Sequence, residues 1–181
     1  MLENVWWSIL VALDVLKNPI IVGGLVIGGV MLGITARLAA RRFGWRPVPS
    51  VLAGISLGVV LGVTFSRTLP DYSSMPGVVA QDRPFCYLNG FSASGANELL
   101  NLLLFVPLVF FAVLATRRPL AVAGAAVALS AVIELVQPIT NRGLCETQDF
   151  LNNSAGSLVA AAAAAALVAL LSRRVQERAS R

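Results

Sequence analysis

Five apolar blocks, each bounded by charged residues or by proline, limit how this chain can fold. A helix needs roughly twenty apolar residues to cross a hydrocarbon core of about 30 Å, and the blocks approach that length. Transmembrane strands would instead show alternating segments of about ten residues, so helices are the expected spanning form. The blocks cover residues 20–36, 51–65, 99–115, 120–136 and 151–171.

Composition supports the same interpretation. Hydrophobic residues make up 57% of the 181 residues and charged residues only 13%, far from the composition of a soluble domain. The sequence therefore predicts an all-α polytopic membrane protein, a bundle of about five transmembrane helices that forms a single domain over residues 1–181.

The arginines divide the predicted loops into two groups. Because Lys and Arg collect in cytoplasmic loops, we expect the N-terminus outside and the C-terminus in the cytoplasm, with residues 173–181 as a basic cytoplasmic tail. The basic balance then reports topology and contact with anionic lipids, and we expect no nucleic-acid partner. The arginines concerned are Arg37, Arg41, Arg42 and Arg46 in the first loop, Arg117 and Arg118 in the third, and Arg173, Arg174, Arg178 and Arg181 after the last block.

The outer side of this topology holds an N-terminal segment, a long loop and both cysteines. Residues 1–19 are expected to form an outer interfacial segment, because their tryptophans suit the membrane surface, although a sixth, shorter crossing stays open. Residues 67–96 form the longest outer loop, which is either a lid over the helix ends or a disordered link. Cys86 and Cys145 both fall outside, where a disulfide persists, and the alternative is two unpaired thiols.

Polar side chains recur at helical spacing in the last three blocks, near a kink expected at Pro107. Spacings of three and four residues put each set on one helix face, and the topology puts every set at the outer end of its helix. Structural roles stay open, with Asp149 as a helix N-cap and with Asn101 and Asn153 as partners in interhelical hydrogen bonds. The sets are Asn97, Glu98 and Asn101; Ser130, Glu134 and Gln137; and Asp149, Asn153 and Gly156.

Four motifs follow one another in the C-terminal half: N-L-L-L-F-V-P from Asn101 to Pro107, E-L-V-Q from Glu134 to Gln137, Arg142, and D-F-L-N-N-S-A-G from Asp149 to Gly156. Their order and spacing resemble the successive signatures of VanZ-like membrane proteins. The resemblance covers about residues 97–167, within a VanZ-like helical core expected at 97–172, and departs at Val109, where the family often has glycine. It implies a multi-pass protein of the bacterial cytoplasmic membrane, related to one that gives low-level resistance to the glycopeptide teicoplanin.

We expect the polar cluster to hold the head of a lipid, a lipid-linked wall precursor or a lipidated glycopeptide such as teicoplanin. Arg142 and Arg67 would meet anionic groups or neutralise the carboxylates. No cofactor and no metal is expected, and a homo-oligomer stays open. The expected ligand-binding residues are Asn101, Glu134, Gln137, Arg142, Asp149, Asn153, Arg67 and Glu98.

Other functions stay open beside binding. A membrane enzyme acting on a lipid-linked substrate would use Glu134 and Asp149 as an acid/base pair, but the chain has no histidine, so we lean against catalysis. A lipid transporter or scramblase would need a polar path toward the cytoplasm, whereas the inner halves of the helices are apolar. A purely structural cluster would only hold the bundle together.

Overall fold

The computed structural model describes residues 19–65 and 84–180. The predicted interfacial segment up to residue 18, the first part of the outer loop with Arg67, and Arg181 lie outside the described residues.

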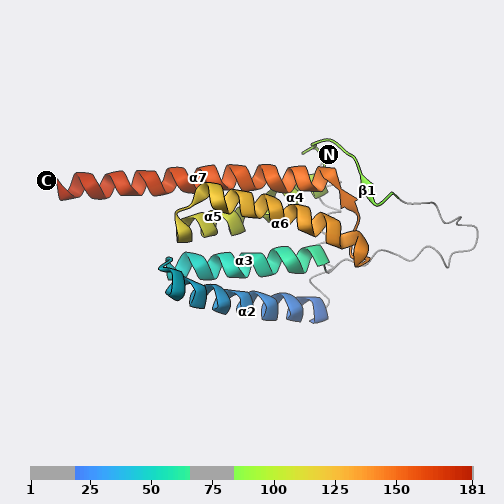
Figure 1. Ribbon diagram of the computed structural model, residues 1–181, viewed down its shortest axis with the longest axis horizontal. Coiled ribbons are helices and arrows are strands. Elements are labelled where there is room, and N and C mark those ends of the chain that lie inside the picture. Colours follow the sequence, from blue (N-terminus) through green and yellow to red (C-terminus); the bar gives the residue numbers. More distant parts are fainter. Residues whose placement is uncertain (1–18, 66–83, 181) are drawn as a thin grey trace, which may run out of the picture.

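The described residues form six helices and two short strands (Figure 1). The helices are α2 (Pro19–Phe43), α3 (Pro47–Phe65), α4 (Ala96–Leu104), α5 (Val106–Thr116), α6 (Pro119–Ile139) and α7 (Thr147–Ala179). The strands are β1 (Cys86–Tyr87) and β2 (Cys145–Glu146).

Five helical segments are long and apolar enough to cross a membrane, because α4 and α5 follow one another closely and count as one. They are Val22–Phe43, Pro47–Phe65, Asn97–Thr116, Pro119–Ile139 and Thr147–Ala179. The predicted all-α fold with about five membrane-length helices is therefore confirmed, and the chain is a multi-pass membrane protein.

Local sequence explains where several helices begin and end. Pro47 and Pro119 open α3 and α6, as expected for a residue that lacks the N–H group which a first helical turn leaves unbonded. Gly44 follows α2 with a φ of +69°, a left-handed conformation that suits glycine after a helix. Between α4 and α5 the helix is interrupted at Phe105, two residues before Pro107, as the sequence predicts.

The last helix is longer than its apolar block. With 33 residues, α7 is about 50 Å long at 1.5 Å per residue, so it exceeds the membrane core and projects beyond the other helices (Figure 1). Residues 173–179 of the predicted tail continue this helix. Arginine has a good helix propensity, so a change from apolar to basic side chains does not end a helix.

The connections that contain the arginines lie at one end of the bundle, and those that contain the two strands lie at the other (Figure 1). At one end, the Arg46 N–H group at the start of α3 donates to the Ala115 carbonyl near the end of α5, at 3.2 Å. This arginine-rich end also holds the α5–α6 turn and the projecting part of α7. The opposite end, which we call the disulfide end, holds β1, β2 and the α6–α7 connection.

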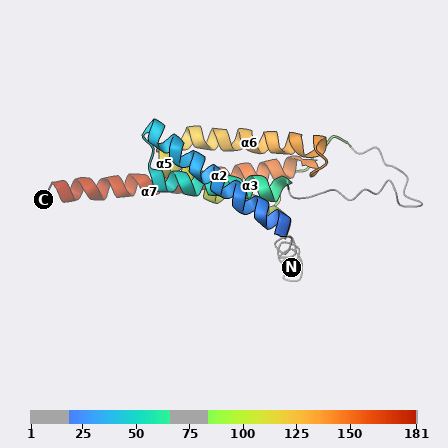
Figure 2. The ribbon, with the colours of Figure 1, turned by 90° about the horizontal axis from the view of Figure 1, so that it is seen from below.

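The interior is apolar and formed mainly by α3, α5, α6 and α7, with α2 packed on the outer side of α3 (Figures 1 and 2). Glycines permit the α2–α3 contact, since a Cβ on Gly58 would lie only 2.7 Å from the Gly29 Cα. The core residues are Val60, Phe105, Val109, Val113, Ala123, Ala126, Ile133, Ala160, Ala161 and Ala164.

Candidate functional site

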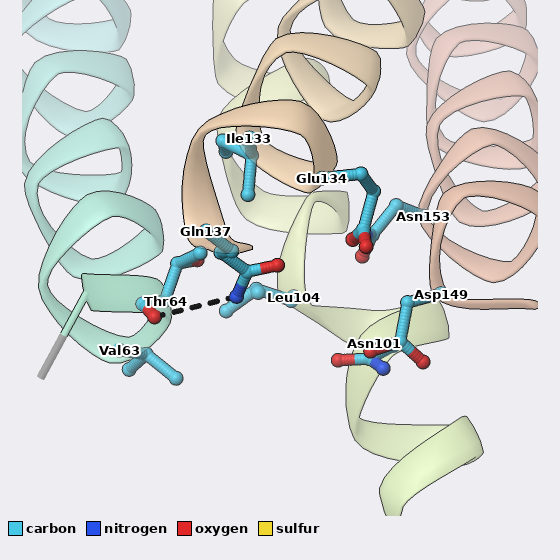
Figure 3. Close-up of a pocket in the computed structure, with 9 residues that line it drawn as sticks. All are labelled: Val63, Thr64, Asn101, Leu104, Ile133, Glu134, Gln137, Asp149 and Asn153. Carbon is cyan, nitrogen blue, oxygen red and sulfur yellow. Dashed lines mark hydrogen bonds between the residues drawn. The ribbon is translucent and has the colours of Figure 1, made fainter. Parts of the chain in front are cut away.

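A small, partly open pocket lies toward the disulfide end, lined by residues of α3, α4, α6 and α7 (Figure 3). Its volume is about 30 Å³, enough for about two water molecules at roughly 10–15 Å³ each. Leu104 and Ile133 supply apolar walls. The polar residues that line it are Thr64, Asn101, Glu134, Gln137, Asp149 and Asn153.

Glu134 brings a carboxylate into this pocket from α6. Its side chain is only 5% exposed, and its Oε2 atom accepts the backbone N–H of Glu146 at 3.0 Å. None of the described residues that line the pocket is basic. A charged group so deeply buried is costly without a counter-ion or further hydrogen bonds, so Glu134 favours a positively charged or proton-donating ligand.

Three amide side chains that line the pocket each have a buried atom with no hydrogen-bond partner in the described part of the chain: Asn101 Nδ2, Gln137 Oε1 and Asn153 Oδ1. Asn153 is only 4% exposed. Figure 3 shows its side chain and that of Glu134 pointing toward one another. Because buried polar atoms are normally hydrogen-bonded, these atoms lack partners that a water molecule or a ligand would supply.

Gln137 and Thr64 join α6 to α3 at one wall of the pocket. Gln137 Nε2 donates to the Thr64 carbonyl at 3.5 Å, which leaves the amide oxygen directed away from α3 (Figure 3). The Thr64 hydroxyl donates to the Val60 carbonyl of its own helix at 2.6 Å. Thr64 was not among the expected site residues, and the available signal was a polar residue at the end of an otherwise apolar block.

Asp149 lies in the first turn of α7 and lines the same pocket as Glu134. A carboxylate there is favoured by the helix dipole. The N-cap position of α7 is occupied by Glu146, so Asp149 is not the N-cap residue that the sequence left open. Two of the three carboxylates of the predicted cluster, those of Glu134 and Asp149, therefore line one pocket.

The structure places two other expected ligand residues elsewhere. Glu98, on α4, forms two hydrogen bonds to α7. Its Oε1 atom accepts a hydrogen bond from Gln148 Nε2 and its backbone carbonyl accepts one from Asn152 Nδ2, both at 3.2 Å. Arg142 is exposed in the α6–α7 connection, and its backbone N–H donates to the Gln137 carbonyl at 3.0 Å. Neither residue lines the pocket.

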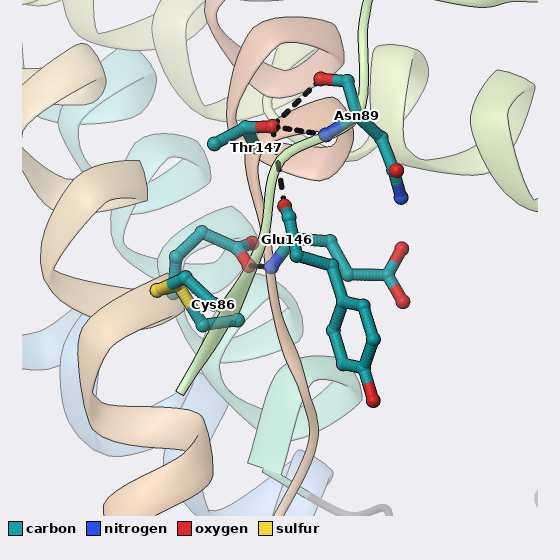
Figure 4. Close-up of a disulfide and its surroundings, with 7 residues drawn as sticks. Cys86, Asn89, Glu146 and Thr147 are labelled. Carbon is teal, nitrogen blue, oxygen red and sulfur yellow. Dashed lines mark hydrogen bonds between the residues drawn. A yellow bond between two sulfur atoms is a disulfide. The ribbon is translucent and has the colours of Figure 1, made fainter. Parts of the chain in front are cut away.

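Residues 84–89, which we call the strap, are fastened over the start of α7 (Figure 4). A disulfide joins Cys86 to Cys145, and β1 pairs in parallel with β2. The Thr147 hydroxyl donates to the Asn89 carbonyl at 2.6 Å and accepts the Asn89 N–H at 2.7 Å. This part of the long outer loop is thus fixed to the helix ends.

The strap is also linked to the pocket, through a hydrogen bond made by β2. Glu146, the residue after Cys145, is the one whose N–H group bonds Glu134. The disulfide consequently holds in place the backbone donor that orients the most buried carboxylate of the pocket. Within the described ranges, no group of three or more His, Cys, Asp or Glu side chains is arranged to hold a metal ion.

Comparison with known proteins gives one match. The family model described as VanZ/LLP1 matches residues 4–169, which extends the likeness from the C-terminal half to α2 and α3. No curated protein and no solved structure matches the chain.

Proposed function

The chain belongs to the VanZ/LLP1 family, and on that premise we propose that it binds the polar head of a lipid or lipid-linked envelope molecule. The pocket between α3, α4, α6 and α7 is the proposed binding site. The observation that carries this proposal is a set of buried amide atoms without partners among the described residues, gathered beside a buried carboxylate in a bundle of membrane-length helices.

The surface of α4 supports a lipid as the source of that polar group. Asn101 lines the pocket, whereas Leu99, Leu100 and Leu103 on the same short helix are exposed. A lipid whose head enters the pocket would therefore find apolar surface for its chains on the neighbouring helix face. A teicoplanin-like glycopeptide with an acyl chain has the same division into polar and apolar parts.

We further propose that the disulfide end faces the outside of the bacterial cytoplasmic membrane. The arginines gather at the opposite end, as expected for the cytoplasmic side, and a disulfide persists in an oxidising compartment. The ligand would then come from the outer leaflet.

Binding fits the structure better than transport. Beyond the pocket the described interior is mainly apolar, with Val60, Phe105 and Val109 fully buried, although the side chains of Ser130 and Ser157 are also buried there. A headgroup that crossed the membrane through this core would lose its hydrogen bonds, at a cost of several kcal/mol.

A carboxylate-dependent enzyme is the second candidate, because Glu134 and Asp149 line one cavity as an acid/base pair requires. It differs from binding in one measurable way, which is turnover. Incubation of the protein with lipid-linked substrates, followed by mass analysis of the lipids, would show a new product if this candidate is right.

The test of binding uses the purified protein in lipid nanodiscs with a panel of lipids, lipid-linked wall precursors and teicoplanin. Native mass spectrometry measures which molecule stays bound to the wild type, Glu134→Gln and Asn153→Leu. Glu177→Gln serves as a matched control, because it removes a carboxylate at the arginine-rich end. We expect selective retention by the wild type and the control, and weaker retention by both pocket variants. Equal retention by all four proteins would refute the pocket as the binding site.

A further inference from the structure

The pocket has a definite electrostatic character that narrows the class of ligand. We propose that the group it takes is a primary ammonium, as in an aminoethyl phosphate headgroup, with the phosphate held outside the pocket near Arg142. This inference rests on the proposed function, since it states which part of a lipid head enters the cavity.

The donor and acceptor pattern supports an ammonium group. A primary ammonium donates three hydrogen bonds and accepts none. Glu134 offers a buried carboxylate, and Gln137 Oε1 and Asn153 Oδ1 offer amide oxygens without partners in the described structure. These three acceptor groups equal in number the three hydrogen atoms of one ammonium group, and none of the described lining residues is basic. A phosphate in the same place would meet the carboxylates of Glu134 and Asp149 and two amide oxygens, against the one unpartnered donor Asn101 Nδ2, and this balance disfavours it.

The small volume of the pocket favours a small cationic group over a bulkier one. A volume of about 30 Å³ accommodates a group as small as one or two water molecules. An –NH₃⁺ group is of that size, whereas each added methyl group enlarges the head and removes a donor. A quaternary trimethylammonium group keeps its charge but has neither the size nor the N–H groups that this pocket fits.

The donor set also distinguishes an ammonium group from a metal ion. Calcium takes about six to eight oxygen ligands, preferably several carboxylates. In the described ranges, no three His, Cys, Asp or Glu side chains are arranged for a metal ion. Ammonium, in contrast, requires fewer oxygen atoms and tolerates neutral amide acceptors.

Arg142 is the residue that would bind the phosphate of the headgroup. Its turn packs against Gln137, since a Cβ on Gly143 would lie 2.7 Å from Gln137 Nε2, and the Arg142 N–H bonds the Gln137 carbonyl at 3.0 Å. The exposed guanidinium is therefore attached beside a pocket residue. Arginine binds phosphate through paired hydrogen bonds, so a headgroup with an ammonium and a phosphate can contact both sites.

The experiment is a methylation series. The full-length protein is placed in phosphatidylglycerol nanodiscs with one guest lipid at a time: phosphatidylethanolamine, its monomethyl and dimethyl derivatives, or phosphatidylcholine. Native mass spectrometry measures retention of each guest by the wild type, Glu134→Gln, Arg142→Ala and the Glu177→Gln control. Water-soluble phosphoethanolamine and Mg²⁺ are added in separate arms, to distinguish a free amine or a metal ion from a lipid.

We expect affinity to fall with each methyl group, and to be about tenfold to a hundredfold lower for phosphatidylcholine, as for loss of charge-assisted hydrogen bonds. Glu134→Gln should abolish the preference, Arg142→Ala should weaken all phosphate-bearing guests alike, and Glu177→Gln should behave as the wild type. Displacement by soluble phosphoethanolamine would identify the same chemistry without a need for acyl chains.

Three results would overturn the inference. A flat methylation series in the wild type would do so, even if Glu134→Gln failed to accumulate. So would displacement of the guest by Mg²⁺ alone, or a preference for phosphatidylglycerol that Glu134→Gln removes. In that last case the pocket still binds a lipid head and the proposed function stands, whereas pocket variants without effect on any lipid would refute both.

Discussion

Replacing Asn153 by leucine should make the protein more stable and a poorer binder. Asn153 is 4% exposed on α7, and its Oδ1 atom has no hydrogen-bond partner among the described residues. Leucine removes this unmet polar atom. The adjoining pocket of about 30 Å³ accommodates part of the extra volume of leucine, which limits the strain that the larger side chain puts on the helices.

The expected gain follows from the cost of the buried amide. An unmet buried polar group costs about 1–3 kcal/mol in soluble proteins. In membranes the unfolded reference state also finds partners for such groups, and interhelical hydrogen bonds there average only about 0.6 kcal/mol. We therefore expect Asn153→Leu to raise the free energy of unfolding by about 1 kcal/mol, which corresponds to about 2–4 °C in Tm for a chain of this length.

The neighbouring residue gives a matched control. Asn152 is 0% exposed, lies outside the pocket lining, and its Nδ2 atom donates to the Glu98 carbonyl at 3.2 Å. Asn152→Leu removes this bond between α7 and α4, and its larger side chain enters a fully buried position outside the pocket lining. The Oδ1 atom of Asn152, like that of Asn153, has no partner among the described residues, and its removal offsets part of this loss. The free energy of unfolding should still fall, by about 1 kcal/mol, while lipid retention is unchanged.

Thermal unfolding of both variants in detergent, followed by loss of helical circular dichroism, measures the stability change. Native mass spectrometry of the same samples in nanodiscs measures lipid retention. If Asn153→Leu lowers Tm as Asn152→Leu does, then Asn153 holds the bundle together and the idea of an amide reserved for a ligand is wrong. A higher Tm with full lipid retention would show that Asn153 is not part of the binding site.

Other predictions concern the strap, the helix packing and the topology. Reduction of the Cys86–Cys145 disulfide should weaken lipid retention several-fold while the helical circular dichroism remains, because the strap orients the pocket but does not form the bundle; unchanged retention would contradict this. Gly156→Leu should reduce accumulation in the membrane, since even a Cβ there would run into the backbone of α4, and normal accumulation would show that the helices can separate. Leu88→Cys should react with an impermeant maleimide in intact cells and Val175→Cys only after permeabilisation, because both positions are exposed and lie at opposite ends; the reverse pattern would invert the topology.

The membrane-spanning helices were predictable because hydropathy is an average over many residues, which no single contact changes. The residues at which these helices end were harder to predict. The sequence-based block ended at residue 171, yet α7 continues to Ala179, since helix propensity and not apolar character decides where the backbone stops. In contrast, α3 and α6 begin at Pro47 and Pro119, where a local rule for proline applies.

The pocket could be predicted in part, because spacing along a helix fixes which residues share a face. Asn101, Glu134 and Asn153 meet in one cavity with Gln137 and Asp149. Spacing does not fix how each helix is rotated against its neighbours. Glu98, three residues before Asn101, turns instead toward Gln148. Thr64 was not predicted as a site residue. It contacts Gln137 through its backbone carbonyl, and because every residue has such a carbonyl, the sequence gives no signal for this contact.

The strap makes the geometry of the pocket depend on whether the compartment is oxidising or reducing. The backbone N–H of Glu146 bonds Glu134, and Glu146 adjoins a cysteine that the disulfide fixes to the strap. A reducing compartment would release the strap and with it the alignment of this donor. If the disulfide end faces outward, as the arginines predict, the pocket therefore reaches its binding geometry only after this end of the chain has crossed the membrane and been oxidised. Under the proposed function, binding would then be confined to lipids of the outer leaflet by the disulfide chemistry as well as by position.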